Sequence, residues 1–309
     1  MTAALPPDAD VLFVTDGGME TTLLFRDGLE LPEFASFVLL DDEAGLEALR
    51  GYFESYLQLA ADLNAGIVLD TPTWRANADW GARLGYDAER LADVNRRGVA
   101  LLRELRDRRG DEPPMLISGC IGPRGDGYVV GETMTLDEAE RYHAAQIATF
   151  ADEEVDLVSA LTLTYADEAS GIVHAARRHG VPVVISFTVE TDGRLPSGQE
   201  LGEGIEQVDR DTEGAAAYFM VNCAHPTHFA HVLEAGAPWQ ERIVGLRANA
   251  STKSHAELDA SDELDSGDPD DLARRYRALK DALPRLAVVG GCCGTDERHI
   301  AAVARAFTP

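Results

Sequence analysis

Eight short apolar segments alternate with helical patterns along the 309 residues of this chain, and this alternation predicts an α/β fold. The segments lack an apolar–polar alternation, which is typical of parallel strands buried on both faces. No low-complexity linker divides them, so residues 1–309 are expected to form a single domain. Eight strand–helix units in this length predict a closed (β/α)8 TIM barrel. A doubly wound open sheet is the alternative, but the glycine fingerprint that binds dinucleotides is missing after the first strand.

The expected strands are apolar runs, most of which end in polar or glycine-rich residues. They lie at residues 11–14, 67–69, 115–117, 155–164, 181–189, 218–221, 243–246 and 286–289. The fifth run is rich in β-branched residues and is bounded by Asp192 and Gly193. Polar or glycine-rich signals follow the first, second, third, fifth, sixth and eighth strands. A barrel gathers these strand ends at its C-terminal mouth, so we expect the active site there.

The expected helices of the first half show apolar residues at helical spacing. Residues 42–63 and 87–108 carry this pattern. Thr135 and Glu138 have the spacing of a capping box, so a further helix is expected to begin at Thr135. The helix after the fourth strand is expected to end at Gly180.

Toward the C-terminus, residues 251–270 are rich in serine and aspartate and are expected to form a solvated loop. Asp268 is expected to cap the helix that follows, with Pro269 in its first turn. Thr295 is expected to cap the last helix, which reaches Phe307.

The chain is strongly acidic, with a formal net charge of −27. This charge argues against nucleic acid and anionic membranes as partners, because both bind clustered cations. Lys253 and Lys280 are the only lysines, so arginine carries almost all of the positive charge. No apolar run is long enough to span a bilayer, and residues 1–10 lack the features of a signal peptide. With four cysteines and no disulfide framework, we expect a cytoplasmic protein; nothing in the sequence predicts its oligomeric state.

Two adjacent cysteines, Cys292 and Cys293, follow the last strand in a glycine-rich stretch. Neighbouring strand residues point to opposite faces, so both thiols can reach one metal only if the backbone leaves strand geometry, which glycine permits. Cys223 also lies just past an apolar run. Three thiolates at strand ends suit a tetrahedral Zn²⁺ whose fourth position stays open, as in catalytic sites. Buried small residues or a vicinal disulfide are the alternatives.

Six short motifs in chain order strengthen the metal interpretation. They are residues 16–21 (Asp-Gly-Gly-Met-Glu-Thr), 71–77 (Thr-Pro-Thr-Trp-Arg-Ala-Asn), 118–123 (Ser-Gly-Cys-Ile-Gly-Pro), 186–188 with 192–193, 222–223 (Asn-Cys) and 290–294 (Gly-Gly-Cys-Cys-Gly). Together they resemble the zinc-dependent homocysteine S-methyltransferases, a family that includes the S-methylmethionine and betaine enzymes and the homocysteine domain of cobalamin methionine synthase. The pairing of Asn-Cys with Gly-Gly-Cys-Cys-Gly is the specific part of this resemblance.

The resemblance implies that Cys223, Cys292 and Cys293 hold Zn²⁺. The thiol of homocysteine would take the fourth position as a thiolate and attack an activated methyl group, giving methionine. The partners would be a small-molecule thiol acceptor and a methyl donor with an electrophilic methyl, such as a sulfonium or a quaternary ammonium. With no cobalamin or folate module in the sequence, a free small-molecule donor is expected.

Other motif residues are expected to contact the substrates. Asp16 would hold the amino-acid part of the acceptor, although it could instead cap a turn. Gly17 and Gly18 would let the backbone approach the substrate or form a tight turn. Trp74 would stack on a cationic donor or belong to the core. His225 is expected to pack in its loop rather than bind metal, and Cys120 is expected to be a buried small residue.

One stretch departs from the family pattern. Many members carry a glutamate in a fourth-strand motif, Glu-Thr-x-Pro, which binds the homocysteine amine. Thr162 stands near that position here, and we place it among the substrate-binding residues. Another acid would then bind the amine, and we expect Asp16 first, then Glu168 and Glu190. Otherwise the acceptor is a different thiol, and a zinc hydrolase or a redox sensor on the same barrel is the more distant alternative.

Overall fold

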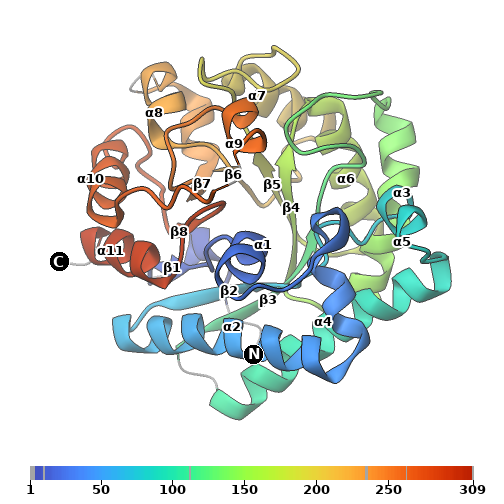
Figure 1. Cartoon of the computed structure of the whole chain (residues 1–309). Coiled ribbons are helices and arrows are strands. Elements are labelled where there is room, and N and C mark those ends of the chain that lie inside the picture. Colours follow the sequence, from blue (N-terminus) through green and yellow to red (C-terminus); the bar gives the residue numbers. More distant parts are fainter. Residues whose placement is uncertain (1–3, 10, 111–112, 234–235, 262, 308–309) are drawn as a thin grey trace.

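Eight parallel strands form a closed barrel in the order of the sequence, as predicted (Figure 1). This computed structural model describes residues 4–9, 11–110, 113–233, 236–261 and 263–307. The strands are β1 (Phe13–Val14), β2 (Gly66–Asp70), β3 (Met115–Ile121), β4 (Leu157–Leu163), β5 (Val183–Phe187), β6 (Tyr218–Asn222), β7 (Ile243–Ala248) and β8 (Val288–Gly291). Phe13 of β1 is in register with Gly66 of β2 and Val288 of β8, which closes the sheet.

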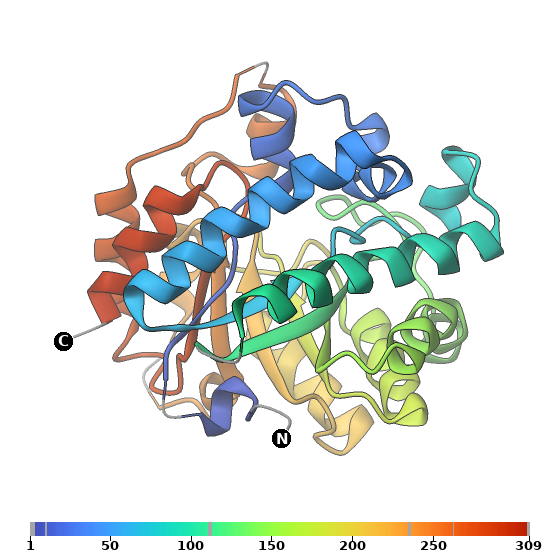
Figure 2. The ribbon, with the colours of Figure 1, turned by 90° about the horizontal axis from the view of Figure 1, so that it is seen from below.

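Helices surround the barrel. They are α1 (Met19–Thr21), α2 (Glu43–Leu63), α3 (Ala78–Arg83), α4 (Ala88–Arg109), α5 (Leu136–Asp152), α6 (Ala166–His179), α7 (Leu201–Thr212), α8 (Pro226–Phe229), α9 (His255–Asp259), α10 (Pro269–Leu279) and α11 (Glu297–Phe307). Figure 2 shows α2 and α4 running alongside each other on the outside of the barrel. None of the helices in the described part of the chain combines the length and the apolar run that crossing a membrane requires.

Several predicted helix ends are confirmed. Thr135 forms a capping box with Glu138 at the start of α5, and Gly180 ends α6 in a left-handed conformation. Asp268 caps α10 through a hydrogen bond from the backbone N–H of Asp270.

Two predictions near the C-terminus are wrong. Asp296, not Thr295, accepts a backbone N–H at the start of α11, because the Thr295 hydroxyl donates to the carbonyl of Cys292 instead. The segment 251–270 is not simply a solvated loop. It contains α9, which begins with a capping box between Ser254 and Glu257.

Apolar side chains form two clusters, one on each face of the sheet. The inner cluster fills the barrel and consists of Phe13, Val68, Leu116, Cys120, Leu157, Leu161, Val184, Tyr218, Met220, Val244 and Val288. The outer cluster lies between strands and helices and includes Ile67, Ile117, Val158, Ile185, Phe219, Leu246, Leu57, Leu102, Ile147, Ile172 and Val303. Leu5 and Ala9 pack against the inner cluster, and Figure 2 shows this N-terminal segment at the opposite end of the barrel from α1. The inner cluster therefore closes one end, and the other end is left for a site.

Strand β7 contains one extra residue. Phe219 of β6 is in register with Ile243, and the next residue, Met220, is in register with Gly245. Val244 therefore has no partner on β6, which is the arrangement of a β-bulge.

This bulge reverses the side-chain alternation of β7. Val244 belongs to the inner cluster, but Leu246, two residues later, belongs to the outer cluster. In a regular strand both would lie on the same face. Because of the shift, Arg247 lies in the barrel interior, at the end where the strands stop.

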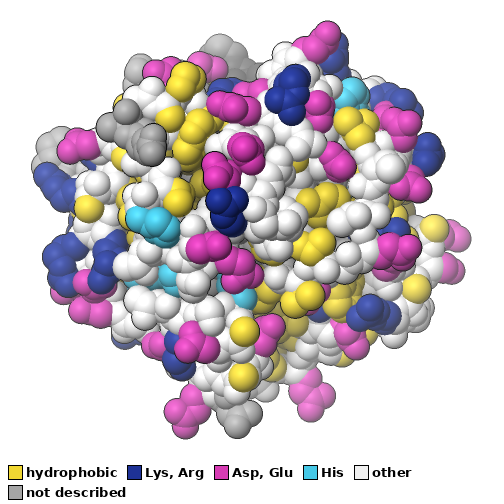
Figure 3. All heavy atoms as spheres, turned by 90° about the horizontal axis from the view of Figure 1, so that it is seen from above, with side chains coloured by type: hydrophobic (Ala, Val, Ile, Leu, Met, Phe, Trp, Pro, Cys, Tyr) yellow, Lys and Arg dark blue, Asp and Glu magenta, His cyan; other side chains and the backbone are white. Residues whose placement is uncertain are grey.

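Acidic and basic side chains are interspersed over the face drawn in Figure 3, and the described residues form no continuous basic patch on it.

Candidate functional site

A cavity of about 410 Å³ lies at the C-terminal ends of the strands. Its walls come from β2, β3, β4, β6 and β7 and from the loops after β1, β2, β3, β6, β7 and β8, with α1 and the end of α9 at its rim. Every site residue predicted from the sequence lines it: Asp16, Gly17, Gly18, Trp74, Thr162, Cys223, Cys292 and Cys293. The structure thus brings together the polar strand ends that the sequence suggested.

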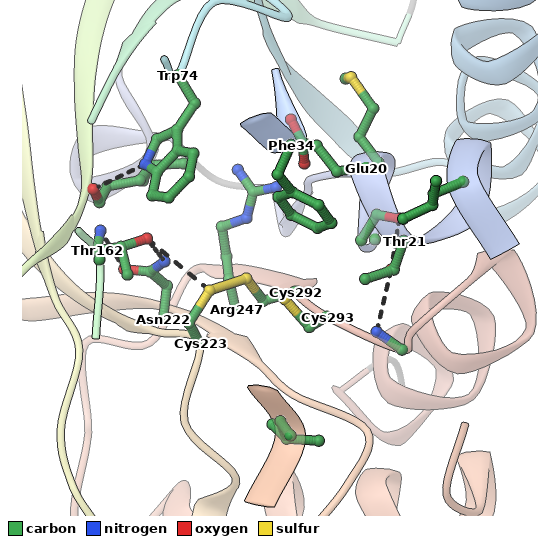
Figure 4. Close-up of a pocket in the computed structure, with 18 of the residues that line it drawn as sticks. Glu20, Thr21, Phe34, Trp74, Thr162, Asn222, Cys223, Arg247, Cys292 and Cys293 are labelled. Atoms are coloured by element: carbon green, nitrogen blue, oxygen red, sulfur yellow. Dashed lines mark hydrogen bonds between the residues drawn. A yellow bond between two sulfur atoms is a disulfide. The ribbon is translucent and has the colours of Figure 1, made fainter. Parts of the chain in front are cut away.

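The three cysteines Cys223, Cys292 and Cys293 meet in one cluster, with all sulfur atoms within 4.8 Å of one another (Figure 4). Strand β8 ends at Gly291, and Gly294 is left-handed with φ +80°, so the backbone leaves strand geometry as expected. Cys223 and Cys292 are joined in a disulfide, and Cys293 is a free thiol whose pKa burial raises to about 11.

The cysteine cluster fits a zinc site. Zinc prefers thiolates in a tetrahedral arrangement, and three sulfurs this close can surround one ion. Because a disulfide offers no thiolate, the Cys223–Cys292 bond must be reduced before the cluster can hold metal. Among the described residues, this group of potential ligands includes no histidine or carboxylate.

Gly17 and Gly18 follow β1 and lie against the loop that carries the cysteines. A Cβ atom on Gly17 would lie 2.6 Å from the Thr295 carbonyl oxygen, and one on Gly18 would lie 2.6 Å from the Cys292 carbonyl oxygen. No other residue type fits this approach. The backbone N–H of Gly18 also donates to Thr295.

Thr162 lies at a bulge of β4 with a left-handed backbone, φ +64°. Such a conformation is strained for a β-branched residue. Asn222 holds it in place, because its Oδ1 accepts from the Thr162 N–H (2.8 Å) and its Nδ2 donates to Thr162 Oγ1 (2.8 Å). Ser186 donates to the same Oδ1 (2.6 Å). The Thr162 hydroxyl lies 3.8 Å from the sulfur of Cys223, so this network also positions one cysteine.

Arg247 forms buried ion pairs with Asp16 and Asp70. Tyr52 donates a hydrogen bond to the other oxygen of Asp16 (3.0 Å). Burial raises the pKa of Asp16 to about 6, although Arg247 acts in the opposite direction. Sequence reasoning missed Arg247, because its strand parity points outward until the β7 bulge is known.

Tyr128 lies over the cysteines from the glycine-rich loop after β3. Its hydroxyl is 3.4 Å from the sulfur of Cys293, and its ring stacks on His255 of α9 at 4.0 Å between centroids. His255 Nε2 is 2.8 Å from the carbonyl of Cys223, and its Nδ1 is 3.3 Å from Glu190. Sequence reasoning missed both aromatic rings, because their loops carried only glycine and polar signals.

Trp74 lines the cavity, with its indole N–H donating to the carbonyl of Leu161 (3.1 Å). The Arg75 guanidinium lies 5.0 Å from its ring centroid. Two other residues have the structural roles predicted for them. Cys120 is buried, and His225 packs in its loop, where it caps α8 by accepting the N–H of Thr227.

Of the three acids expected to bind an amine, Asp16 lines the cavity but Glu168 and Glu190 do not. Glu168 is buried against His143 (2.9 Å). Glu20, which sequence reasoning did not single out, does line the cavity. Its only signal was its place within residues 16–21, directly after β1.

Comparisons with known proteins agree with this geometry. The family model described as homocysteine S-methyltransferase matches residues 13–307. The chain is 27% identical to methionine synthase of Mycobacterium tuberculosis over 308 residues, covering 96% of this chain but only 24% of that protein. It is 24% identical to homocysteine S-methyltransferase 4 of Zea mays, covering 84% of this chain and 79% of the relative.

Solved structures confirm the barrel. The homocysteine methyltransferase MmuM from Escherichia coli matches in its oxidized form with a TM-score of 0.75 and 20% identity, covering 99% of this chain and 98% of that one. Its metallated form matches with a TM-score of 0.73 and 18% identity, covering 96% of each. Because the family model spans nearly all of the sequence, this chain belongs to the homocysteine S-methyltransferase family of enzymes.

Proposed function

We propose that this protein is a zinc-dependent S-methyltransferase that moves a methyl group from a sulfonium or quaternary ammonium donor to the thiolate of homocysteine, giving methionine. The observation that carries the proposal is the three-cysteine cluster facing a cavity large enough for small molecules. A cluster without histidine or carboxylate among its described members favours thiolate chemistry over a zinc hydrolase, which more often uses those ligands.

Zinc held by Cys223, Cys292 and Cys293 would supply a Lewis acid that lowers the pKa of the acceptor thiol, so that the thiol loses its proton to solvent near neutral pH. Side chains and loops of the protein hold the cysteines in position. Asn222 and Thr162 fix Cys223, and the loops carrying Gly18 and Tyr128 enclose the cysteines from two sides.

Five other residues of the cavity would bind the two small molecules. We assign Trp74 to the cationic donor, because aromatic faces attract cations. Asp16, Gly17 and Gly18 would position the acceptor, and Thr162 would line the same wall. Since three free thiolates are required, we also propose a reducing compartment, such as the cytoplasm.

The test is a zinc and activity assay on protein purified under reductant. We expect about one zinc per chain, and methionine formed from homocysteine with either S-methylmethionine or betaine, detected by mass spectrometry. The double variant Cys292→Ser, Cys293→Ser should lose both zinc and activity. Cys120→Ser, which changes a cysteine outside the cluster, should retain both. Unchanged zinc in the double variant would contradict the metal assignment, and no methylation of any thiol would contradict the reaction.

A further inference from the structure

The acidic side chains that line the cavity differ in whether other groups of the protein already pair with their carboxylates. They are Asp16, Glu20, Asp70, Asp126, Asp259, Glu263 and Asp265. Asp16 and Asp70 share the buried guanidinium of Arg247. A carboxylate that already has a cation gains less from a second one. Asp16 would therefore position the acceptor through the wall it forms with Gly17 and Gly18, and not by binding an ammonium group.

The acids at the rim are also accounted for. Asp126 forms an ion pair with Arg75 (3.8 Å). Both oxygens of Asp265 accept hydrogen bonds, one from the hydroxyl of Ser251 (2.6 Å) and one from the backbone N–H of Gly267 (3.1 Å). Asp259 and Glu263 are exposed, where water weakens any ion pair.

Glu20 is different from all of these acids. It is half-buried, and among the described residues Ser36 is the one side chain that donates a hydrogen bond to its carboxylate, at 2.7 Å to Oε1. No ion pair within 4 Å links Glu20 to an arginine or lysine of the described chain. Burial raises its pKa, and Arg75 and Arg247 counteract this only as lesser, more distant influences. A cationic group on a ligand would therefore give Glu20 the ion pair that the described residues do not provide.

The position of Glu20 ties it to the cysteines. Its neighbour Thr21 accepts a hydrogen bond from the N–H of Gly294 (3.2 Å), directly after Cys293. On the other side, Gly18 lies against the carbonyl of Cys292. Figure 4 shows Glu20 and the cysteines around the same space. A small thiol whose sulfur reaches the cysteine cluster therefore has Glu20 as a close anionic neighbour.

We propose that Glu20 binds the ammonium group of the acceptor and makes the enzyme specific for amino thiols. This inference rests on the proposed function and adds a specificity residue to it. The carboxylate would accept a charge-assisted hydrogen bond from the ammonium, and Ser36 would hold its other oxygen in place. The acceptor's carboxylate and chain would then extend into the rest of the cavity.

The test compares homocysteine with 4-mercaptobutanoate, which is the same thiol without the amine. Glu20→Gln keeps the shape of the side chain and removes its charge. We expect it to raise the KM for homocysteine ten- to a hundredfold, with kcat nearly unchanged, and to leave the KM for 4-mercaptobutanoate within about twofold. Calorimetric titration of the zinc-loaded protein with each thiol should show the same difference in Kd. Glu20→Asp should recover part of the affinity.

Matched controls separate this role from a structural one. Glu263→Gln makes the same change in an exposed acid of the same cavity and should leave both constants unchanged. Zinc content and melting temperature of Glu20→Gln should equal those of the wild type. Equal effects on both thiols, or a raised KM for the methyl donor alone, would overturn the assignment while the methyltransferase function stands. A wild type that methylates neither thiol would overturn the proposed function and this inference with it.

Discussion

At the scale of single residues, the site combines charges that the fold has removed from water. Asp16 and Asp70 share Arg247, so this group of three carries one uncompensated negative charge when all are ionised. Tyr52 adds a hydrogen bond to Asp16. Such a group orients its members strictly, because breaking one contact leaves a buried charge unpaired.

Asp16 should make the stability of the protein depend on pH. Burial raises its pKa to about 6 from the ordinary 3.8, so between these values the folded state holds a proton that the unfolded chain has released. The stabilisation from this proton is fully present below about pH 4 and is lost as pH rises through about 6. Relative to Asp16→Asn, the wild type should lose about 1–3 kcal/mol of unfolding free energy over this range, as measured by urea denaturation. If the free energy of unfolding changed with pH in the same way in both proteins, the raised pKa would be contradicted. The control variant Glu263→Gln should show the pH dependence of the wild type.

At the scale of the elements, two irregular strands shape the site. The bulge of β4 places Thr162 in its left-handed conformation, and the bulge of β7 places Arg247 inside the barrel. Bulges cost ladder hydrogen bonds, so other contacts must compensate for them. Asn222 does this for β4 by bonding both the backbone and the side chain of Thr162.

Removing Asn222 should therefore destabilise the whole β4 end. Asn222→Ala deletes three buried hydrogen bonds and leaves the Thr162 N–H without a partner. We expect the free energy of unfolding to fall by about 2–4 kcal/mol, measured by chemical denaturation. Ser186→Ala, which removes only one of these bonds, should cost about 1 kcal/mol. Zinc affinity should also fall, since Asn222 no longer holds the Thr162 hydroxyl beside the sulfur of Cys223. Equal stability of the two variants would argue against this role of Asn222.

Much of the architecture was predictable because it depends on local patterns. Buried parallel strands require apolar runs, and helix ends require particular residues such as Thr135 and Gly180. The cysteine cluster was predictable because Cys223 and Cys292 follow strands that end at the same mouth. Arg247 and Glu20 were not, because their roles depend on a bulge and on which other charges are already paired. These are properties of the assembled barrel and not of any segment.

At the scale of the whole molecule, the cysteine cluster lies outside the apolar clusters that hold the barrel together. None of the cluster cysteines belongs to the inner or the outer apolar cluster. We expect a barrel with an apolar core of this size to be stable without a metal, unlike a zinc finger.

Chelation should consequently leave the fold intact. After zinc removal under reductant, the circular dichroism spectrum should stay close to that of the metal-loaded protein, and the melting temperature should fall by only a few degrees because bound metal stabilises the folded state. A sample treated with reductant alone provides the control. A collapse of the helical signal would mean that the metal is structural, and the catalytic proposal would weaken with it.

The extra residue in β7 has a consequence for how such a barrel can change by descent. Losing it would leave Arg247 in register with Asn222 and still facing inward. Gaining one residue between the bulge and Arg247 would instead turn Arg247 outward, so that Asp16 and Asp70 would face each other in a dry interior without a cation. Two ionised carboxylates cannot share such a place, and one would have to be protonated or replaced. A lineage can therefore lose the extra residue and keep this group of charges, but it can gain a residue just before Arg247 only together with a change in Asp16 or Asp70. Insertions between the bulge and Arg247 should be rarer among descendants of this chain than insertions in its surface loops.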